Sequence, residues 1–344
     1  MRNVANPSQL VKDAAKDVRD MSQNFDFFPL GQEVSMREGF GRALVTLGRM
    51  RSDLYLFDAD VAGGTGARPF AEAFPERVMQ FGIAEQNLMA AAAGFADTGL
   101  IPVVAGFASF TVMRAHEQLR TAVCYGGRNV KVCCSHVGLD TGPDGATAQM
   151  LEDLATCRAI PGLTVVVPAC ANEIQPLLAA VIDEPGPVYM RIGRSPSPVL
   201  YQNPGPIRLG KGDVLRQGDD LTLIACGTRV TAALKASELL NAVAINARVV
   251  NMRSIKPADH PLIERCCRET GAIVTVEDHT AIGGLGGAVA ESVVQGTPVP
   301  MEIVAIGDSF GRSGEHNELF SAYGIDVADI VAAAHNVFRR KHRS

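Results

Sequence analysis

Short apolar runs alternate with amphipathic stretches along most of the chain, a pattern typical of parallel α/β proteins. The runs are rich in Val, Ile, Leu and Phe and are too short for helices, so they predict buried strands. In the first half of the chain we expect strands at 54–57, 102–107, 130–135, 164–167 and 188–192. Because helical patterns fill most of the intervals, the sheet should be parallel and covered by helices on both faces.

The alternation stops between residues 196 and 211, where prolines and glycines interrupt any periodicity. It then restarts, with strands expected at 221–226, 248–252, 272–277 and 302–306. The fold class is therefore α/β, with two domains that are each based on a parallel sheet. The predicted organisation is a lead-in with a surface helix near 8–22 (1–34), a first α/β domain (35–195), a linker (196–211) and a second, smaller α/β domain (212–344).

Composition agrees with two sizeable cores, because 47% of the 344 residues are hydrophobic and 20% are charged. The formal net charge is -5, and the basic cluster at 339–343 is interpreted as a solvated helix end rather than a nucleic-acid surface. No apolar run reaches the length of a membrane span, and the N-terminus lacks the order of a signal peptide. We expect a soluble, cytoplasmic protein that binds neither nucleic acid nor membrane.

Eight cysteines are present, and they show no spacing typical of a metal site. Two adjacent pairs occur at 133–134 and 266–267, and most of the cysteines lie in apolar stretches. They are expected to be buried, reduced thiols that act as small apolar side chains.

The segment 82–87, GIAEQN, leads directly into a helix of small apolar residues at 88–96. This places Glu85 at the first turn of a helix that is apolar almost all round, and such a helix is expected to be buried. Apolar surroundings favour the neutral carboxyl, whereas the helix dipole favours the charged one. Acids are also common at helix starts for purely structural reasons. The residue alone leaves both interpretations open.

Polar side chains follow three of the predicted strands. Asp60 and Thr65 follow the first strand, His136 and Asp144 follow the strand at 130–135, and Arg194 follows the strand at 188–192. A lone loop histidine is ordinarily a surface or capping residue. If the sheet is parallel, however, these groups converge at the edge where open α/β sheets bind ligands, which favours a functional site.

The glycine-rich segment 283–287 also follows a strand and opens a helix, a setting in which backbone amides can hold a phosphate. Its spacing does not fit the dinucleotide-binding motif. We therefore interpret it as a close contact between helix and sheet.

Several of these segments, in this order and spacing, resemble the transketolase family of thiamin-diphosphate-dependent enzymes. GIAEQN with its small-residue helix is similar to the family's pyrimidine-binding signature. The other matching segments are FASF at 107–110, RAHEQLR at 114–120, SH at 135–136 with GPDGAT at 142–147, VYMRIGR at 188–194 and EDH at 277–279. The resemblance covers nearly the whole chain after about residue 35.

The resemblance implies a cofactor site. Glu85 would hydrogen-bond a ring nitrogen of the cofactor's aminopyrimidine and favour the imino tautomer that activates the thiazolium. Phe107 and Phe110 would pack on the same ring. Asp60, at the end of its strand, is a further cofactor-binding candidate.

The resemblance also implies a substrate site for phosphosugars. His136 would bind ketose hydroxyls and assist proton transfer, and Asp144 would bind a substrate hydroxyl. Arg194 would meet the acceptor's phosphate, with Arg37 and Thr65 as further phosphate contacts. The implied reaction is transfer of a two-carbon ketol unit from a ketose to an aldose.

The chain departs from the family pattern in three respects. Ala148 follows Thr147 where many members have a substrate-binding histidine, so the choice of donor sugar is open. Met113 replaces a third aromatic residue. The G-D-G and asparagine motifs that bind the diphosphate and its metal are missing, and the chain itself offers no metal ligands.

These absences predict a split enzyme. A separate N-terminal transketolase subunit would hold the diphosphate and Mg²⁺ (or Ca²⁺), and the two subunits would form an α2β2 heterotetramer. Two alternatives stay open: the β subunit of a 2-oxo-acid dehydrogenase, which shares the GIAEQ motif, and a non-catalytic assembly subunit.

Overall fold

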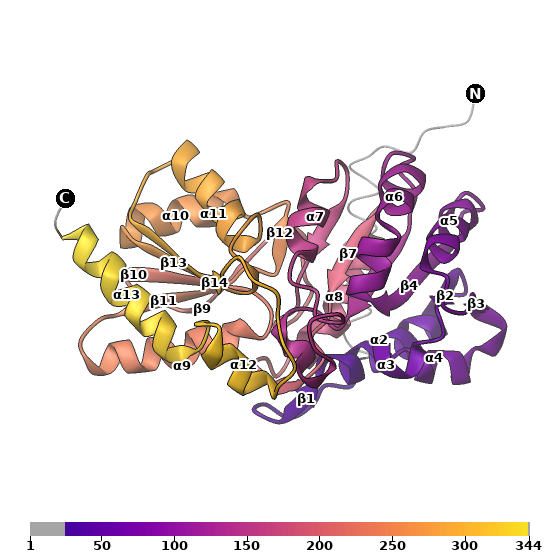
Figure 1. The fold of residues 1–344 in the computed structure, drawn as a ribbon, viewed down its shortest axis with the longest axis horizontal. Helices are drawn as coiled ribbons and strands as arrows, with labels where there is room; N and C mark the ends of the chain where they lie inside the picture. Colours follow the sequence, from indigo (N-terminus) through magenta and orange to yellow (C-terminus); the bar gives the residue numbers. More distant parts are fainter. Residues whose placement is uncertain (1–24, 343–344) are drawn as a thin grey trace.

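The structure, a computed structural model, describes residues 25–342 and contains two α/β units that lie side by side (Figure 1). One unit is built on a seven-stranded sheet and the other on a five-stranded sheet. This architecture confirms the predicted fold class. The surface helix predicted near 8–22 lies outside the described residues.

The first sheet has the strand order β12-β6-β7-β5-β4-β2-β3. All neighbouring strands are parallel except β12, which runs antiparallel to β6 at one edge. All five strands predicted in the first half of the chain are present, whereas β3 and β12, each three residues long, were not predicted. The strands are β2 (Leu54–Asp58), β3 (Val78–Gln80), β4 (Ile101–Phe107), β5 (Lys131–Ser135), β6 (Thr164–Val166), β7 (Val188–Arg191) and β12 (Ser254–Lys256).

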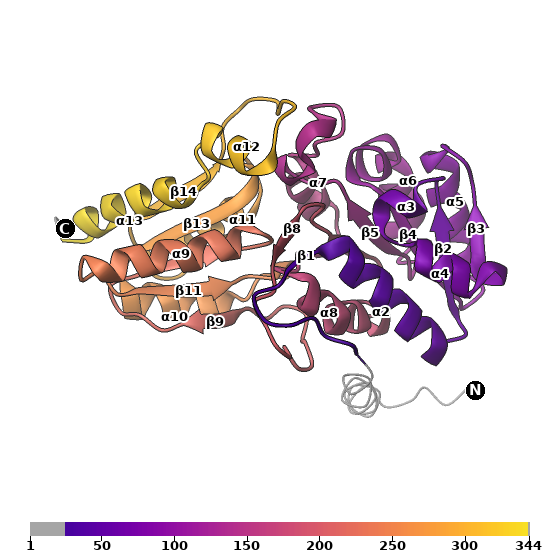
Figure 2. The ribbon, with the colours of Figure 1, turned by 90° about the horizontal axis from the view of Figure 1, so that it is seen from below.

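Helices cover both faces of this sheet because successive strand residues point to opposite sides. Val103 of β4 packs in one apolar cluster with α2 and α8, whereas its neighbour Val104 packs in another with α5 and α7. Figure 2 shows α2 and α8 adjacent on one side, with α5 and α6 on the other. The helices are α2 (Met36–Met50), α3 (Ala62–Thr65), α4 (Arg68–Ala73), α5 (Glu85–Ala96), α6 (His116–Gln118), α7 (Asp153–Ala159) and α8 (Ala171–Asp183), with π-helical segments at Ser109–Arg114 and Leu119–Cys124.

The second sheet has the order β14-β13-β10-β11-β9, and only β9 is antiparallel to its neighbour. All four strands predicted in this half are present. The strands are β9 (Asp213–Arg216), β10 (Leu221–Ala225), β11 (Ala247–Asn251), β13 (Ile273–Thr280) and β14 (Met301–Ile306). One face packs on α9 (Arg229–Ala242), α12 (His316–Ala322) and α13 (Val327–Lys341), and the other on α10 (His260–Thr270) and α11 (Leu285–Gln295).

Buried polar contacts join the two units. The carboxylate of Asp278, in β13, accepts hydrogen bonds from the backbone N–H groups of Leu139 and Asp140 at 2.8 and 3.0 Å. Arg191, at the end of β7, pairs with Asp153 at 2.8 Å and donates to the backbone oxygen of Asp278. The second unit therefore fixes the loop that follows β5 in the first unit.

The segment expected as a linker between the two units, 196–211, contains a short strand. This strand, β8 (Pro196–Pro198), pairs antiparallel with β1 (Glu33–Ser35), which immediately precedes α2. The domain limits given above stay a prediction.

All eight cysteines are buried and unpaired, as predicted. Burial raises the pKa of the Cys124 thiol to about 11 and that of the Cys133 thiol to about 12, so these two stay protonated at neutral pH. Between residues 25 and 342 no cluster of three His, Cys, Asp or Glu side chains is placed to hold a metal ion. Within the same range no helix has the length and apolar character needed to cross a membrane.

Candidate active site

Several of the predicted site residues lie at the carboxyl ends of strands that are neighbours in the first sheet. The order β7-β5-β4-β2 places Arg194, His136 and Phe107 at the ends of three adjacent parallel strands, on the same carboxyl edge. The segment that follows β2 completes this edge with Gly64. The residues could be picked out one by one along the chain, whereas the strand order brings them together.

His136 lies at the centre of this edge. Its ring centroid is 3.8 Å from that of Phe107, and its Nε2 is 3.5 Å from a carboxylate oxygen of Asp144. The other oxygen of Asp144 is 3.4 Å from the guanidinium of Arg194. His136 adopts a left-handed backbone conformation, with φ of 59°, which is uncommon outside glycine. The structure therefore places these four predicted residues in one contact group.

The imidazole of His136 is neutral at physiological pH. Burial, followed by the charges of Arg37 and Arg194, lowers its pKa to about 3. Its Nδ1 lies 2.9 Å from the hydroxyl of Ser135. Because a carboxylate only accepts hydrogen bonds, the proton belongs on Nε2, which faces Asp144, and Nδ1 accepts from Ser135.

Glu85 lies at the other end of the same group of residues. It begins α5 and is only 4% exposed, and its Oε2 accepts a hydrogen bond of 2.7 Å from Arg114. The guanidinium of Arg114 lies 4.8 Å from the centre of the Phe110 ring, and the Phe110 ring lies 6.5 Å from that of Phe107. Contacts thus run without a break from Glu85 to Arg194.

Arg114 was not predicted from the sequence as a partner of Glu85. It begins the RAHEQLR segment, so the signal was present in the chain, but no local spacing links it to an acid 29 positions earlier. Its position is set by the π-helical segment Ser109–Arg114, which also carries Phe110.

The prediction that helix α5 is buried all round is wrong. Leu88 and Met89 pack in the core, whereas Gln86, Asn87 and Ala90 are exposed. Alanine and glycine raise the apolar content of a helix without showing which face is covered. The prediction that Glu85 itself is buried is confirmed.

Arg37 reaches the edge from α2. It donates a hydrogen bond of 2.9 Å to the backbone oxygen of Gly64, and its pKa is lowered by burial and then by the charge of Arg194. Gly64 itself lies against Phe107, because a Cβ at this position would meet the ring at 2.6 Å. Two cations, Arg37 and Arg194, therefore flank His136, which suits an anionic group on a substrate.

Two predicted residues are not brought into this group. Thr65 is 1% exposed, and its hydroxyl bonds the backbone oxygen of Ala62 and the N–H of Ala67, so it stabilises its own turn. Asp60 is exposed at the end of the β2 segment and makes no hydrogen bond or ion pair with another candidate residue in the described chain.

Asp140 and Asp278 position the substrate side of the group. The Asp140 carboxylate accepts hydrogen bonds from the backbone N–H groups of Arg194 and Ser195. The Asp140 N–H in turn donates to Asp278. Burial raises the pKa of Asp278 against the opposing effect of Arg191 and Arg229. Neither positioning role had a local signal in the sequence.

The glycine-rich segment 283–287 is confirmed as a close packing contact. The carboxylate of Glu277 accepts hydrogen bonds of 2.7 Å from the N–H groups of Leu285 and Gly286, at the start of α11. A Cβ on Gly284 would lie 2.1 Å from that carboxylate. The helix start is already occupied by a protein acid.

Comparison with known proteins decides the family. The pyrimidine-binding domain of transketolase matches residues 32–198, and the transketolase C-terminal domain matches residues 210–330. The chain belongs to the transketolase family. A putative transketolase C-terminal section from Methanocaldococcus jannaschii is 42% identical, with coverage of 86% of this chain and 94% of the relative.

Other relatives match the chain over similar lengths. One of the subunits of an apulose-4-phosphate transketolase from Phocaeicola vulgatus is 37% identical over 88% of this chain and 96% of the relative. A solved split-gene transketolase, described as an inactive β4 tetramer, has a TM-score of 0.84 and 41% identity, with coverage of 90% of this chain and 99% of that one.

The chemistry of the described residues fits the aminopyrimidine half of thiamin diphosphate, the cofactor that the family implies. Phe107 and Phe110 are half-buried, so part of each ring is open to a ligand. The Oε2 of Glu85 accepts a hydrogen bond from Arg114, whereas its Oε1 has no hydrogen-bond partner within residues 25–342. A ring that stacks on phenylalanine and presents a ring nitrogen matches this set.

Proposed function

We propose that this chain is the C-terminal half of a split transketolase that transfers a two-carbon ketol unit from a ketose or ketose phosphate to an aldose or aldose phosphate. The observation that carries the proposal is the unbroken line of contacts from Glu85 through Phe107 and His136 to Arg194. It supports a cofactor end and a substrate end within one site. The relatives named as transketolase subunits have nearly the same length as this chain, which supports the split organisation.

At the cofactor end, Glu85, Phe107 and Phe110 would hold the aminopyrimidine of thiamin diphosphate. When bound, this cofactor supplies the nucleophilic carbon that attacks a ketose carbonyl. The Oε1 of the buried Glu85 carboxyl would share a proton with a ring nitrogen of the cofactor. Arg114 holds the other oxygen of the carboxyl and so fixes its orientation.

At the substrate end, the neutral imidazole of His136 would donate a hydrogen bond from Nε2 to an oxygen of the ketose. Asp144 lies between His136 and Arg194 and would accept a hydrogen bond from a sugar hydroxyl. The fork of donors on Arg194, with Arg37 nearby, would bind the acceptor's phosphate. Thr65 and Asp60 are not part of this assignment.

The diphosphate and its metal would be held chiefly by a partner, an N-terminal transketolase subunit, in an α2β2 assembly. A diphosphate requires a divalent ion with oxygen ligands, and residues 25–342 contain no group of three acidic or His side chains for one. Mg²⁺ or Ca²⁺ would therefore enter with the partner. A cytoplasmic location is expected of such a phosphosugar enzyme.

The test is reconstitution. The chain is co-expressed with an N-terminal transketolase subunit carrying the G-D-G motif, and ketol transfer is followed over a panel of ketose donors and aldose acceptors. The panel includes apulose 4-phosphate and 6-deoxy-6-sulfo-D-fructose, because relatives named for these sugars are 37% and 34% identical to the chain. We expect transfer by the pair and none by either subunit alone.

The two alternatives give different results in the same assay. Release of carbon dioxide from a 2-oxo acid without ketol transfer would favour a 2-oxo-acid dehydrogenase β subunit. An assembled pair that binds the cofactor yet converts no substrate would favour a non-catalytic role. Tight binding of thiamin diphosphate by the isolated chain in calorimetry would contradict the split of the cofactor site between two subunits.

A further inference from the structure

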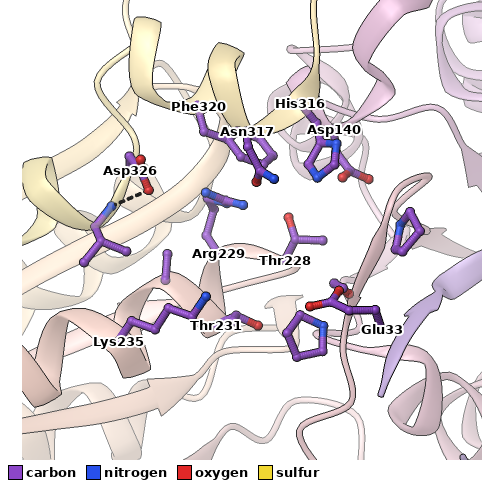
Figure 3. A pocket seen from close by; sticks show the side chains of 15 residues that line it. Glu33, Asp140, Thr228, Arg229, Thr231, Lys235, His316, Asn317, Phe320 and Asp326 are labelled. Carbon is purple, nitrogen blue, oxygen red and sulfur yellow. Dashed lines mark hydrogen bonds between the residues drawn. The ribbon is translucent and has the colours of Figure 1, made fainter. Parts of the chain in front are cut away.

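A cavity of about 160 Å³ lies where the two units meet (Figure 3). It is bordered by β1 and β8 from the first unit and by the starts of α9, α12 and α13 from the second. None of the residues predicted for the active site lines it. Its polar lining includes Thr228, Arg229, Thr231, Lys235, Asp326 and Glu33.

Arg229 is the most unusual of these residues. It is 7% exposed, and its Nε is buried without a hydrogen-bond partner. Its guanidinium lies 3.4 Å from the centre of the Phe320 ring, and Nη1 reaches the backbone oxygen of Ile325 only at 3.5 Å. Figure 3 shows the side chain directed into the space between α9 and α12. A buried donor of a charged group without a partner is costly, so its retention points to a ligand.

The start of α9 adds further donors. Thr228 occupies the N-cap position but makes no capping hydrogen bond, although threonine is a preferred capping residue, and its side chain lines the cavity instead. The Oγ1 of Thr231 is buried and has no partner. Lys235 follows one turn later on the same helix and brings a second cation. An uncapped helix start beside two cations and two free hydroxyls favours an anion.

The acids around the cavity are largely occupied by other groups. Asp326 caps α13, accepting from the Val327 N–H at 2.7 Å and the Ser321 hydroxyl at 2.6 Å. Asp140 is held by the N–H groups of Arg194 and Ser195. Glu33 is exposed on β1 and can accept a hydrogen bond from a hydroxyl group. The hydroxyl of Ser197 and the side chains of His316 and Asn317 also line the cavity, and each of them can donate a hydrogen bond.

We propose that this cavity binds a small oxyanion, the phosphate group of a metabolite of a few carbons or free phosphate, through Arg229, Lys235, Thr228 and Thr231. Its volume suits such a ligand but not a nucleotide. The site is distinct from the acceptor-phosphate position at Arg194. Asp140 lines the cavity, and its carboxylate also accepts a hydrogen bond from the backbone N–H of Arg194. Asp140 therefore connects the anion site directly to the proposed active site.

The test is calorimetric titration of the full chain with inorganic phosphate and with glycerol 3-phosphate, at constant ionic strength set with chloride. Arg229 is buried and its replacement could prevent folding, so the variants are Lys235→Met and Thr231→Val. Arg265→Met, which replaces an exposed cation on α10, is the matched control. Arg194→Ala removes the proposed acceptor-phosphate contact and so distinguishes binding at that position from binding in the cavity.

We expect binding that persists in Arg194→Ala and Arg265→Met and that weakens at least tenfold in Lys235→Met and Thr231→Val. Equal affinity for both probes would assign the site to the phosphate group alone, and tighter binding of the ester would assign it to a phosphorylated metabolite. The proposal is overturned if neither probe binds, or if Arg194→Ala abolishes binding that Lys235→Met leaves unchanged. None of these outcomes bears on the ketol-transfer assay, so the two proposals fail independently.

Discussion

The carboxylate of Glu85 and the guanidinium of Arg114 lie 2.7 Å apart, and Arg114 also lies over the ring of Phe110. The acid is buried, whereas the side chain of Arg114 is 48% exposed. The arginine thus lies between a buried acid and solvent, on the segment that also carries Phe110, an aromatic residue of the proposed cofactor site. Arg114 thus orients Glu85, the acid on which the proposed activity depends.

Replacement Glu85→Gln is expected to lower kcat of the reconstituted pair by two to four orders of magnitude. The amide has nearly the shape of the acid but cannot exchange a proton with a ring nitrogen, and contributions of this kind are typically 10²–10⁴-fold. Glu117→Gln, at an exposed acid of α6, is the control and should change little. Unchanged turnover in Glu85→Gln would remove the assigned role.

Replacement Arg114→Met is expected to destabilise the chain by about 1 kcal/mol, because Glu85 loses its partner while the exposed arginine gives up only a solvent-screened charge. In urea unfolding, the double variant Glu85→Gln/Arg114→Met should lose less stability than the sum of the two single variants. Arg120→Met, an exposed arginine on the next segment, serves as control. Strict additivity would mean that the two residues do not interact.

The stability of the chain should fall as the pH drops from 6.5 towards 3. The pKa of His136 is about 3 in the folded chain against an ordinary value of 6.5, so the unfolded state binds more protons throughout this interval. The slope from this residue is at most about 1.4 kcal/mol per pH unit, and its contribution is fully present above pH 6.5. Urea unfolding of wild type and His136→Gln at pH 7, 6 and 5 measures it. Parallel curves for the two proteins would contradict a buried, neutral histidine.

Replacement Asp278→Ala is expected to lower kcat/KM about tenfold or more, although Asp278 contacts none of the proposed substrate-binding groups. Its carboxylate holds the N–H groups of Leu139 and Asp140, and without it the loop that carries Asp144 loses its anchor. Asp308→Ala, at an exposed acid of the same unit, controls for loss of charge. Normal kinetics with lowered stability would restrict Asp278 to a role in folding.

Replacement Arg194→Lys should raise KM for phosphorylated acceptors about tenfold or more and leave KM for unphosphorylated sugars nearly unchanged. Lysine keeps the charge but lacks the planar pair of donors that fits a phosphate. Arg208→Lys, at an exposed arginine, is the matched control. Equal effects on both classes of acceptor would place the phosphate elsewhere.

The sequence by itself predicted nine of the strands, the burial of the cysteines and most of the residues of the proposed site. Each of the nine predicted strands is present, because an apolar run bounded by turn residues is a local signal that tertiary contacts seldom override. Glu85, His136 and Arg194 were picked out in the same way, as polar residues at the ends of apolar segments. The roles proposed for them came from resemblance to a family.

Tertiary structure alone decided which of these residues meet. The order of the strands is set by pairing between segments far apart in the chain, which also brings β12 from the second half into the first sheet. The same long-range packing paired Glu85 with Arg114, left one face of α5 open and turned the hydroxyl of Thr65 to its own backbone. Local periodicity records which side chains are apolar, but contact partners depend on how whole elements pack.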